Sequence, residues 1–371
     1  FNRGDVLLGA AEFSRALDDF EAALALSPGN AKAEFSAGVA LSALGDLTLA
    51  RQRMNRALTL DPELLSGYVS PLRTDSISAY PELSPERIFI FSRYDRLRSC
   101  DWNDYAAFAR RFGELVCGEG GVAIDNPDFA YISLGIPVAD ACRRSLARNV
   151  ARRIRSPLGR GNFVRPHRTG NARLRIGYLS GDLRAHAVAY LIGGLFELHD
   201  RNRFEVYAYS TGPDDGSRER RRAEAGADVF RDVSAFSGVV IGQAIAMDGI
   251  DILVDLSGYT LYGRPEAMAL RPAPVQVAYL GFMGTQGAPW IDYTLLDRVT
   301  LNAETRPYWD EKIAYLPSFF SLCEKPDLSG DIPSRQAAGL PEEAFVLNAL
   351  HMPRKIDPAS FALWLQVLEA I

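Results

Sequence analysis

The chain has 371 residues, of which 47% are hydrophobic and 23% are charged. These proportions exclude a disordered, collagen-like or disulfide-scaffold protein, and the length predicts about two or three domains. A formal net charge of -5 disfavours a nucleic-acid-binding protein, which needs a basic surface to displace counterions. No apolar run reaches the roughly 20 residues that span a bilayer. We therefore expect a cytoplasmic protein with no nucleic-acid partner and no membrane partner.

The four cysteines are far apart and form neither a CxxC motif nor a zinc-ligand pattern: Cys100, Cys117, Cys142 and Cys323. We expect them to be reduced, buried thiols.

A repeat of 34 residues occupies residues 1–66. Its first copy consists of Ala16, Phe20, Ala23, Leu24, Leu26 and Pro28, and its second copy of Ala50, Met54, Ala57, Leu58, Leu60 and Pro62. The small and apolar residues lie at helical spacing, and each proline follows the helix and prevents it from continuing. The pattern resembles the tetratricopeptide repeat. Such repeats either form a concave groove for extended peptides or act as a spacer, and this sequence leaves both open.

Residues 67–168 are predicted to form a helical connector, because amphipathic segments alternate there with proline and glycine interruptions. Its second half carries nine arginines between Arg143 and Arg168. A phosphate or nucleic-acid patch is one interpretation. A solvated helix face is favoured, given the acidic net charge.

From residue 169 to 334, short β-rich runs alternate with helical segments, which predicts a parallel sheet covered by helices on both faces. The predicted strands are Leu174 to Leu179, Phe204 to Ser210, Val229 to Val233, Ile250 to Leu256, Val275 to Leu280 and Tyr293 to Leu296. Ligands of such sheets bind at the carboxyl ends of the strands. The residues that follow each run are therefore candidate site residues.

Asp182 and His186 follow the first run. If a helix begins near Asp182, the two side chains lie one turn apart at its positive end, where a histidine stays neutral and can accept a proton. The alternative is structural: Asp182 caps the helix, and His186 has no chemical role. The local sequence alone favours this alternative.

Arg264 follows the fourth run, and a glycine-rich segment from Gly281 to Gly287 follows the fifth. Glycines allow a ligand to approach the backbone closely, so Gly281, Met283, Gly284 and Thr285 are candidate substrate-binding residues together with Arg264. As an isolated motif the segment is also compatible with a tight turn. Neither an Asp-x-Asp motif nor a cluster with metal-ligand spacing occurs, which gives no support to a divalent metal.

Read together, these segments resemble the O-GlcNAc transferase family, with the bacterial members closer. The matching segments are Cys-Asp-Trp-Asn-Asp-Tyr (100–105), Arg-Ile-Gly-Tyr-Leu-Ser-Gly-Asp-Leu-Arg-Ala-His (175–186), Phe-Glu-Val-Tyr-Ala-Tyr-Ser (204–210), Gly-Ile-Asp-Ile-Leu-Val-Asp-Leu-Ser-Gly-Tyr-Thr (249–260), Leu-Arg-Pro-Ala-Pro-Val-Gln (270–276), Gly-Phe-Met-Gly-Thr-Gln-Gly-Ala (281–288), Asp-Tyr (292–293) and Glu-Lys-Ile-Ala-Tyr-Leu-Pro (311–317). This resemblance reverses the local preference at Asp182 and His186.

The resemblance implies tetratricopeptide repeats followed by a GT-B glycosyltransferase, an α plus α/β fold. Residues 169–334 would form its Rossmann-like N-terminal lobe, and residues 335–371 would begin the C-terminal lobe. The implied reaction is an inverting, metal-independent and cofactor-free transfer of GlcNAc from UDP-GlcNAc to Ser or Thr hydroxyls of a protein held through the repeat groove. Asp182 and His186 would handle the proton and position the reactants, and Lys355 would neutralise the leaving pyrophosphate.

The sequence also departs from the animal members of the family. A histidine is absent from the segment 126–129, Leu261 stands in place of a lysine, and His351 and Met352 stand in place of Asn and Gln. Two alternatives therefore remain: a Spindly-type protein O-fucosyltransferase that uses GDP-fucose, and a tetratricopeptide scaffold without activity. We expect this chain by itself not to transfer sugar, because most of a GT-B donor site lies on the second lobe.

Overall fold

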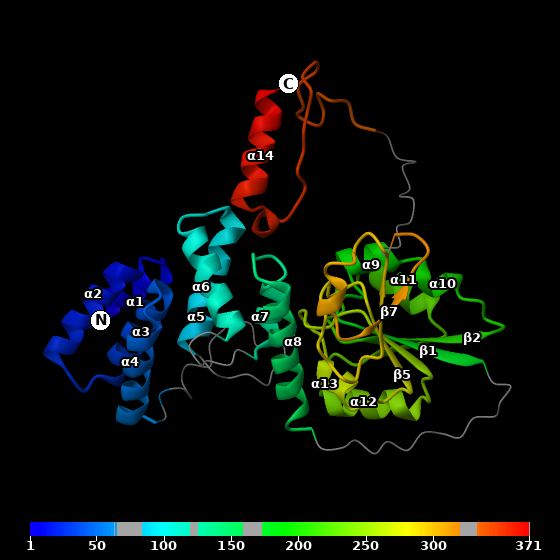
Figure 1. The fold of residues 1–371 in the computed structure, drawn as a ribbon, viewed down its shortest axis with the longest axis horizontal. Coiled ribbons are helices and arrows are strands. Elements are labelled where there is room, and N and C mark those ends of the chain that lie inside the picture. The colour runs from blue at the N-terminus through cyan, green and yellow to red at the C-terminus, as the bar shows by residue number, and fades with distance from the viewer. Residues whose placement is uncertain (63, 65–83, 119–124, 159–172, 320–331, 371) are drawn as a thin grey trace. The chain divides into compact units, whose positions relative to one another are not determined.

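The computed structural model describes residues 1–62, 64, 84–118, 125–158, 173–319 and 332–370 (Figure 1). They fall into two compact units. One contains the described residues up to Phe112 together with those from Leu347 onward, and the other contains Gly113 to Val346. The domain boundaries predicted after residues 66, 168 and 334 stay predictions.

The first unit begins with four helices: α1 (Asn2–Gly9), α2 (Phe13–Leu26), α3 (Ala31–Leu44) and α4 (Leu47–Leu60). α4 repeats α2 at an offset of 34 residues at both ends, as the sequence pattern predicts. Asn30 and Asp46 cap α3 and α4 by accepting a backbone N–H with their side chains. The helical repeat is thus present in the structure.

Small residues let these helices pack closely. Ala16 and Ala50 have no exposed surface, and a Cβ atom at Gly38 would lie only 2.6 Å from Met54 Cγ. The recurring Leu26 and Leu60 stand at the last position of their helices and are 90% and 44% exposed.

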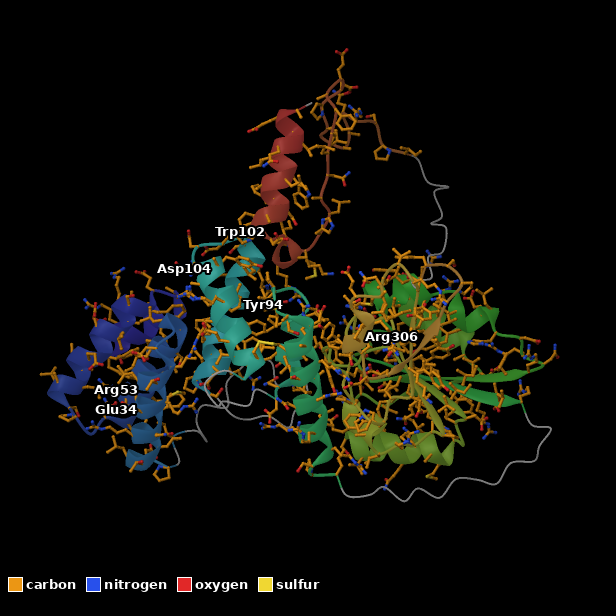
Figure 2. All side chains as sticks on the ribbon, viewed as in Figure 1. Glu34, Arg53, Tyr94, Trp102, Asp104 and Arg306 are labelled. Carbon is orange, nitrogen blue, oxygen red and sulfur yellow. A yellow bond between two sulfur atoms is a disulfide. The ribbon has the colours of Figure 1, made fainter. Side chains whose placement is uncertain are left out.

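The rest of the first unit contains α5 (Pro85–Arg96), the 3-10 turn η2 (Leu97–Ser99), most of α6 (Tyr105–Cys117), η4 (Pro353–Lys355) and α14 (Pro358–Glu369). The segment 100–105 joins η2 to α6 and packs against η4. Trp102 Nε1 donates a hydrogen bond of 3.1 Å to the carbonyl of Ile356, and its ring lies 5.2 Å from that of Phe361 (Figure 2).

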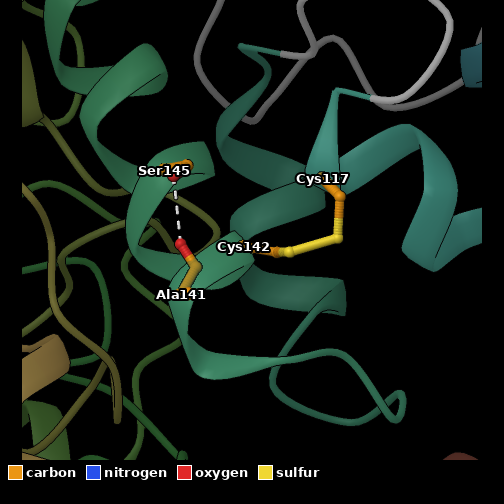
Figure 3. Close-up of a disulfide and its surroundings, with 4 residues drawn as sticks. All are labelled: Cys117, Ala141, Cys142 and Ser145. Carbon is orange, nitrogen blue, oxygen red and sulfur yellow. Dashed lines mark hydrogen bonds between the residues drawn. A yellow bond between two sulfur atoms is a disulfide. The ribbon is translucent and has the colours of Figure 1, made fainter.

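A disulfide joins Cys117, at the end of α6, to Cys142, in the first turn of α8 (Asp140–Arg155) (Figure 3). The prediction of reduced, buried thiols is wrong for this pair. Sequence spacing did not reveal the bond, because the two cysteines are 25 residues apart and come together only through helix packing. Cys100 is a free, partly exposed thiol, and Cys323 lies outside the described residues.

The arginines of α8 form the favoured solvated face only in part: Arg148 and Arg152 are exposed, and the other arginines of the helix are partly buried. Arg143 donates to the carbonyls of Ser133 and Ile136, and Arg144 and Arg148 both bind the carboxylate of Asp310. These side chains therefore fix α8 within the second unit. The arginines at 160, 165 and 168 lie outside the described residues.

The second unit is built on a parallel sheet of seven strands, in the order β3-β2-β1-β4-β5-β6-β7. The strands are β1 (Leu174–Ser180), β2 (Phe204–Ser210), β3 (Val229–Asp232), β4 (Ile252–Asp255), β5 (Val275–Tyr279), β6 (Tyr293–Leu296) and β7 (Lys312–Tyr315). The first six confirm the predicted runs. β7 was not predicted as a strand: it is a short segment at the sheet edge, and only its two middle residues, Ile313 and Ala314, are partly buried.

Helices cover both faces of this sheet: α9 (Ala187–Ile192), α10 (Leu195–Leu198) and α11 (Arg218–Gly226) on one, and α12 (Gly238–Met247) and α13 (Pro265–Ala269) on the other (Figure 1). Apolar residues of β1, β2, β4 and β5 pack against α9 and α10 in one buried cluster. α7 (Pro127–Ile132) packs against α8. The predicted fold class is confirmed. Within the described residues, no helix is long and apolar enough to cross a membrane.

Candidate functional site

The chain changes direction across the sheet between β1 and β4. From β1 it runs outward to β2 and β3, and it then returns to β4 on the other side of β1. Loops that leave the carboxyl ends of strands on either side of such a switch point diverge and open a crevice, where ligands of α/β sheets bind. The loops after β1 and β4 are therefore the first place to look for a site.

These two loops contact each other directly. The Gly181 N–H donates a hydrogen bond of 2.9 Å to Ser257 Oγ. A Cβ atom at Gly181 would lie 2.6 Å from Tyr262 Cβ and 2.9 Å from the carbonyl oxygen of Leu261, so only glycine allows this approach. The glycine after β1 therefore serves loop packing in this structure.

Asp182 and His186 lie together in the loop after β1, although the helix geometry predicted for them is wrong. α9 begins at Ala187, with His186 as its N-cap, and Asp182 precedes it in an irregular turn. Asp182 Oδ2 is nevertheless 3.5 Å from His186 Nδ1. The Asp182 side chain is 6% exposed and that of His186 is 39% exposed, so the imidazole faces solvent while the carboxylate is buried behind it.

Two groups compete for His186 Nδ1. The Val188 N–H lies 3.3 Å away and needs a lone pair there, whereas a hydrogen bond to Asp182 needs a proton there. Burial raises the pKa of Asp182, and the nearby His186 and Arg184 offset only part of that shift. With a proton on Nδ1, Nε2 is free to accept another proton. The pair can therefore supply an oriented base, or His186 can cap α9.

Asp215 holds this loop from outside, and sequence reasoning missed it. Its Oδ2 accepts a hydrogen bond of 2.8 Å from the Ala185 N–H. Hydrogen bonds from Ser217 and from the Ala185 amide lower the pKa of Asp215 to about 2. Its position after β2, at the carboxyl edge of the sheet, was the signal that could have identified it.

Arg264 is the N-cap residue of α13, and its guanidinium is engaged locally. Nη1 donates to the carbonyls of Tyr262 and Gly263, at 3.3 and 3.2 Å. Burial raises the pKa of the neighbouring Glu266, and the charge of Arg264 opposes that rise. Arg264 thus stabilises the end of the loop that touches Gly181.

The glycine-rich segment after β5 is held from beneath by Glu311, a second residue that sequence reasoning missed. Its carboxylate accepts hydrogen bonds from Thr285 Oγ1 at 2.8 Å and from the Gln286 and Gly287 N–H groups at 2.8 and 3.1 Å. Thr285, a candidate substrate-binding residue, is 8% exposed and uses its hydroxyl for this contact. Gly281, Met283 and Gly284 remain partly exposed.

Asp255 links the glycine-rich segment to the loop after β4. It is buried at the last position of β4 and accepts from the N–H groups of Ser257 and Gly258 and from Gln286 Nε2. A Cβ atom at Gly258 would lie 2.6 Å from Phe282 Cβ. The loops after β1, β4 and β5 thus form one continuous network through Gly181, Tyr262 and Gly258.

Lys355 belongs to the other compact unit, at the last position of η4, and its side chain is exposed. It lies one residue before Ile356, whose carbonyl is fixed by Trp102. The segment 100–105, one of those that carry the family resemblance, therefore supports the backbone next to Lys355. In the described part of the chain, no group of three or more His, Cys, Asp or Glu side chains is placed to hold a metal ion.

Residues 99–332 match the family model described as "Glycosyl transferase family 41". The chain is 30% identical over 287 residues to the "Probable UDP-N-acetylglucosamine--peptide N-acetylglucosaminyltransferase SEC" of Arabidopsis thaliana, covering 73% of this chain and 29% of the relative. It is 33% identical over 232 residues to the "UDP-N-acetylglucosamine--peptide N-acetylglucosaminyltransferase" of Caenorhabditis elegans, covering 60% of this chain and 20% of that protein.

A solved structure of a mutant Thermobaculum terrenum O-GlcNAc transferase superimposes with a TM-score of 0.62 at 27% identity, covering 99% of this chain and 65% of that chain. The chain thus spans less than a third of the two curated relatives. The family model covers well over half of this chain, including the loops after β1, β4 and β5. The predicted resemblance is confirmed, and the chain belongs to glycosyl transferase family 41.

Proposed function

We propose that this chain is part of an enzyme that transfers N-acetylglucosamine from UDP-GlcNAc to Ser or Thr hydroxyls of protein acceptors, with inversion and without a metal or other cofactor. The observation that carries the proposal is the contact between the buried Asp182 carboxylate and the solvent-facing His186 imidazole, 3.5 Å apart at the switch point. The family membership and the printed names of the relatives support the donor and the acceptor class.

In this reaction the acceptor oxygen forms a bond to the anomeric carbon while the bond from that carbon to the pyrophosphate oxygen breaks. The hydroxyl proton moves to His186 Nε2, and Asp182 stabilises the resulting imidazolium through Nδ1–H. The diphosphate leaves with the bonding electron pair, and a cation must balance its charge. We assign that role to Lys355, whose side chain is exposed and whose backbone is supported by the contact of Trp102 with Ile356.

The acceptor would bind as an extended segment along the tetratricopeptide-like helices α1 to α4. Stacked helical hairpins present concave surfaces of that kind. The arrangement of the repeat, with an offset of 34 residues and buried small residues at Ala16 and Ala50, supports this part of the proposal.

The sharpest test separates the two roles of His186. Asparagine caps helices well but cannot serve as the base. In the full-length protein, His186→Asn should keep the melting temperature of the wild type within about 2 °C, which corresponds to about 0.5 to 1 kcal/mol for a domain of roughly 200 residues. Its turnover should fall by at least about 100-fold. His186→Ala should lose both the cap and the turnover. Turnover near the wild-type level in His186→Asn would assign His186 to capping alone.

The donor is tested in the same assay with two labelled nucleotide sugars. We expect transfer from UDP-GlcNAc to an acceptor peptide and none from GDP-fucose. Transfer from GDP-fucose alone would assign the chain to protein O-fucosylation. Because the proposed reaction needs no metal, we expect full activity after dialysis against EDTA. Binding of neither nucleotide would indicate a scaffold.

A further inference from the structure

A cavity of about 450 Å³ lies at the carboxyl ends of β6 and β7, beside the loops of the candidate site but distinct from them. Two arginines line it: Arg298, two residues after β6, and Arg306 in η3 (Arg306–Tyr308). Arg306 is labelled in Figure 2. Leu301, Ala303 and Tyr315 form part of its apolar wall. No residue predicted from the sequence lies among them.

The two guanidinium groups are held in place without ion pairs. Arg298 Cζ lies 4.3 Å from the centroid of the Tyr315 ring, a stacking contact that leaves its N–H groups free to bind. Arg306 donates to the backbone carbonyls of Trp309 and Glu311, at 3.1 and 3.5 Å. In the described part of the chain, neither side chain forms an ion pair with a carboxylate.

In the described part of the chain, the acidic side chains near the cavity form no ion pair with Arg298 or Arg306. Asp297 is buried and accepts from the N–H groups of Val299 and Thr300. Asp310 binds both Arg144 and Arg148. Burial raises the pKa of Asp310, but the hydrogen bonds from the two arginines outweigh burial and lower the pKa. Glu311 faces the glycine-rich segment, and Glu304 is exposed. Among the described residues, no carboxylate is therefore paired with the two guanidinium groups, and the rest of the lining is apolar apart from Asn302 and the Tyr315 hydroxyl.

We propose that this cavity binds an anionic side chain of the acceptor, a carboxylate or a phosphate ester, through Arg298 and Arg306. A planar guanidinium matches the geometry of either group with two parallel hydrogen bonds. This inference rests on the proposed function, because it places the cavity on the path of the acceptor.

The sheet order decides between acceptor and donor. β6 lies three strands from β1 and β7 lies four, so the cavity is about 14 to 19 Å from the loop that carries Asp182 and His186, at about 4.8 Å per strand. The phosphates of the donor must lie within a few ångströms of the reacting carbon, to which one of them is bonded. An extended peptide covers the distance in roughly four to six residues. The cavity thus selects an acidic residue at that separation from the modified Ser or Thr.

The test measures peptide binding, not transfer. Fluorescein-labelled peptides would carry one Ser and, five positions before or after it, Glu, Gln or phosphoserine. Fluorescence anisotropy with the full-length protein gives Kd for each peptide, for the wild type and for Arg298→Gln. Arg298 is the variant of choice because Arg306 also binds backbone carbonyls. Arg218→Gln is the matched control. Arg218 is exposed on α11, which connects β2 to β3 at the opposite edge of the sheet from the cavity, and it forms no ion pair in the described residues.

We expect Arg298→Gln to weaken binding of the Glu or phosphoserine peptide about tenfold and to leave the Kd of the Gln peptide unchanged. The control Arg218→Gln should leave the Kd of all three peptides unchanged. The anionic peptide with the larger loss identifies carboxylate or phosphate as the natural group. Equal Kd values for the Glu, phosphoserine and Gln peptides, or discrimination that survives in Arg298→Gln, would overturn the inference. A failure of the proposed function gives a different result: the wild type would transfer no sugar from UDP-GlcNAc, whereas it would still bind the anionic peptides more tightly than the Gln peptide.

Discussion

Glu311 accepts a hydrogen bond of 2.8 Å from Thr285 Oγ1, and its other oxygen accepts from two successive backbone N–H groups of the same glycine-rich segment. A single buried carboxylate thereby fixes the segment from Thr285 to Gly287, and it does so from the residue immediately before the edge strand β7.

Replacing Glu311 by Ala should leave two buried donors, the Thr285 hydroxyl and the Gln286 N–H, without their acceptor, whereas the Gly287 N–H still reaches Thr285 Oγ1. The free energy of unfolding should fall by about 3 kcal/mol. The glycine-rich segment should also become mobile, which hydrogen exchange of the Gln286 and Gly287 amides would report. Glu304→Ala is the control, because Glu304 is exposed on the same connection between β6 and β7. Unchanged exchange at both amides would show that the segment is rigid without Glu311.

Asp255 should make the protein less stable as pH rises. Burial raises its pKa above the ordinary 3.8, and the hydrogen bonds from Gly258, Ser257 and Gln286 offset only part of that rise. The native state therefore binds more protons than the unfolded state above pH 3.8, and the slope of stability with pH from this group is negative until the raised pKa is passed.

Urea unfolding of the wild type and Asp255→Asn at pH values from about 4.5 to 8 measures this contribution. The stability of the wild type relative to Asp255→Asn should fall as pH rises and then become constant. The new amide side chain should fit, because the buried Gln286 Oε1 has no hydrogen-bond partner in the described residues and a turned Gln286 amide could accept from it. A wild-type advantage that grows with pH would contradict the direction of the pKa shift.

Asp215→Ala should release the loop that carries Asp182 and His186, because the Ala185 N–H loses its acceptor. We expect turnover to fall about tenfold or more, as misplacement of a catalytic group commonly costs, with little change in melting temperature since Asp215 is exposed. Asp214→Ala is a matched neighbour, because among the described residues the Asp214 carboxylate accepts a hydrogen bond only from the Gly216 N–H. Equal turnover in the two variants would show that Ala185 needs no tether.

Trp102→Phe keeps an aromatic ring against Phe361 but removes the hydrogen bond to the carbonyl of Ile356. The stability cost should be about 1 kcal/mol. If this contact positions Lys355, turnover should fall several-fold, and the same change should have no further effect in a Lys355→Ala background. Trp364→Phe is the control on α14, since its indole stacks on His351. Additive effects of the two changes would separate Trp102 from Lys355.

Local patterns in the sequence were enough for the elements that carry them. The 34-residue offset between α2 and α4 is a direct consequence of repeated small and apolar residues, because helix packing needs them at the same positions in each copy. Short β-rich runs predicted six of the seven strands, since strands in the middle of a sheet that is covered on both faces, such as β4 and β5, are mainly apolar. The edge strand β7 has no such requirement, and the prediction omitted it.

The candidate site was only partly accessible from the sequence. Asp182, His186 and the glycine-rich segment could be placed, because parallel strands bring the residues that follow them to one edge of a sheet. The tertiary structure alone decided that His186 caps α9, that Cys117 pairs with Cys142, and that Glu311 holds Thr285. Each of these contacts joins residues through the packing of loops and helices, which depends on three-dimensional distance and leaves no periodic pattern in the chain.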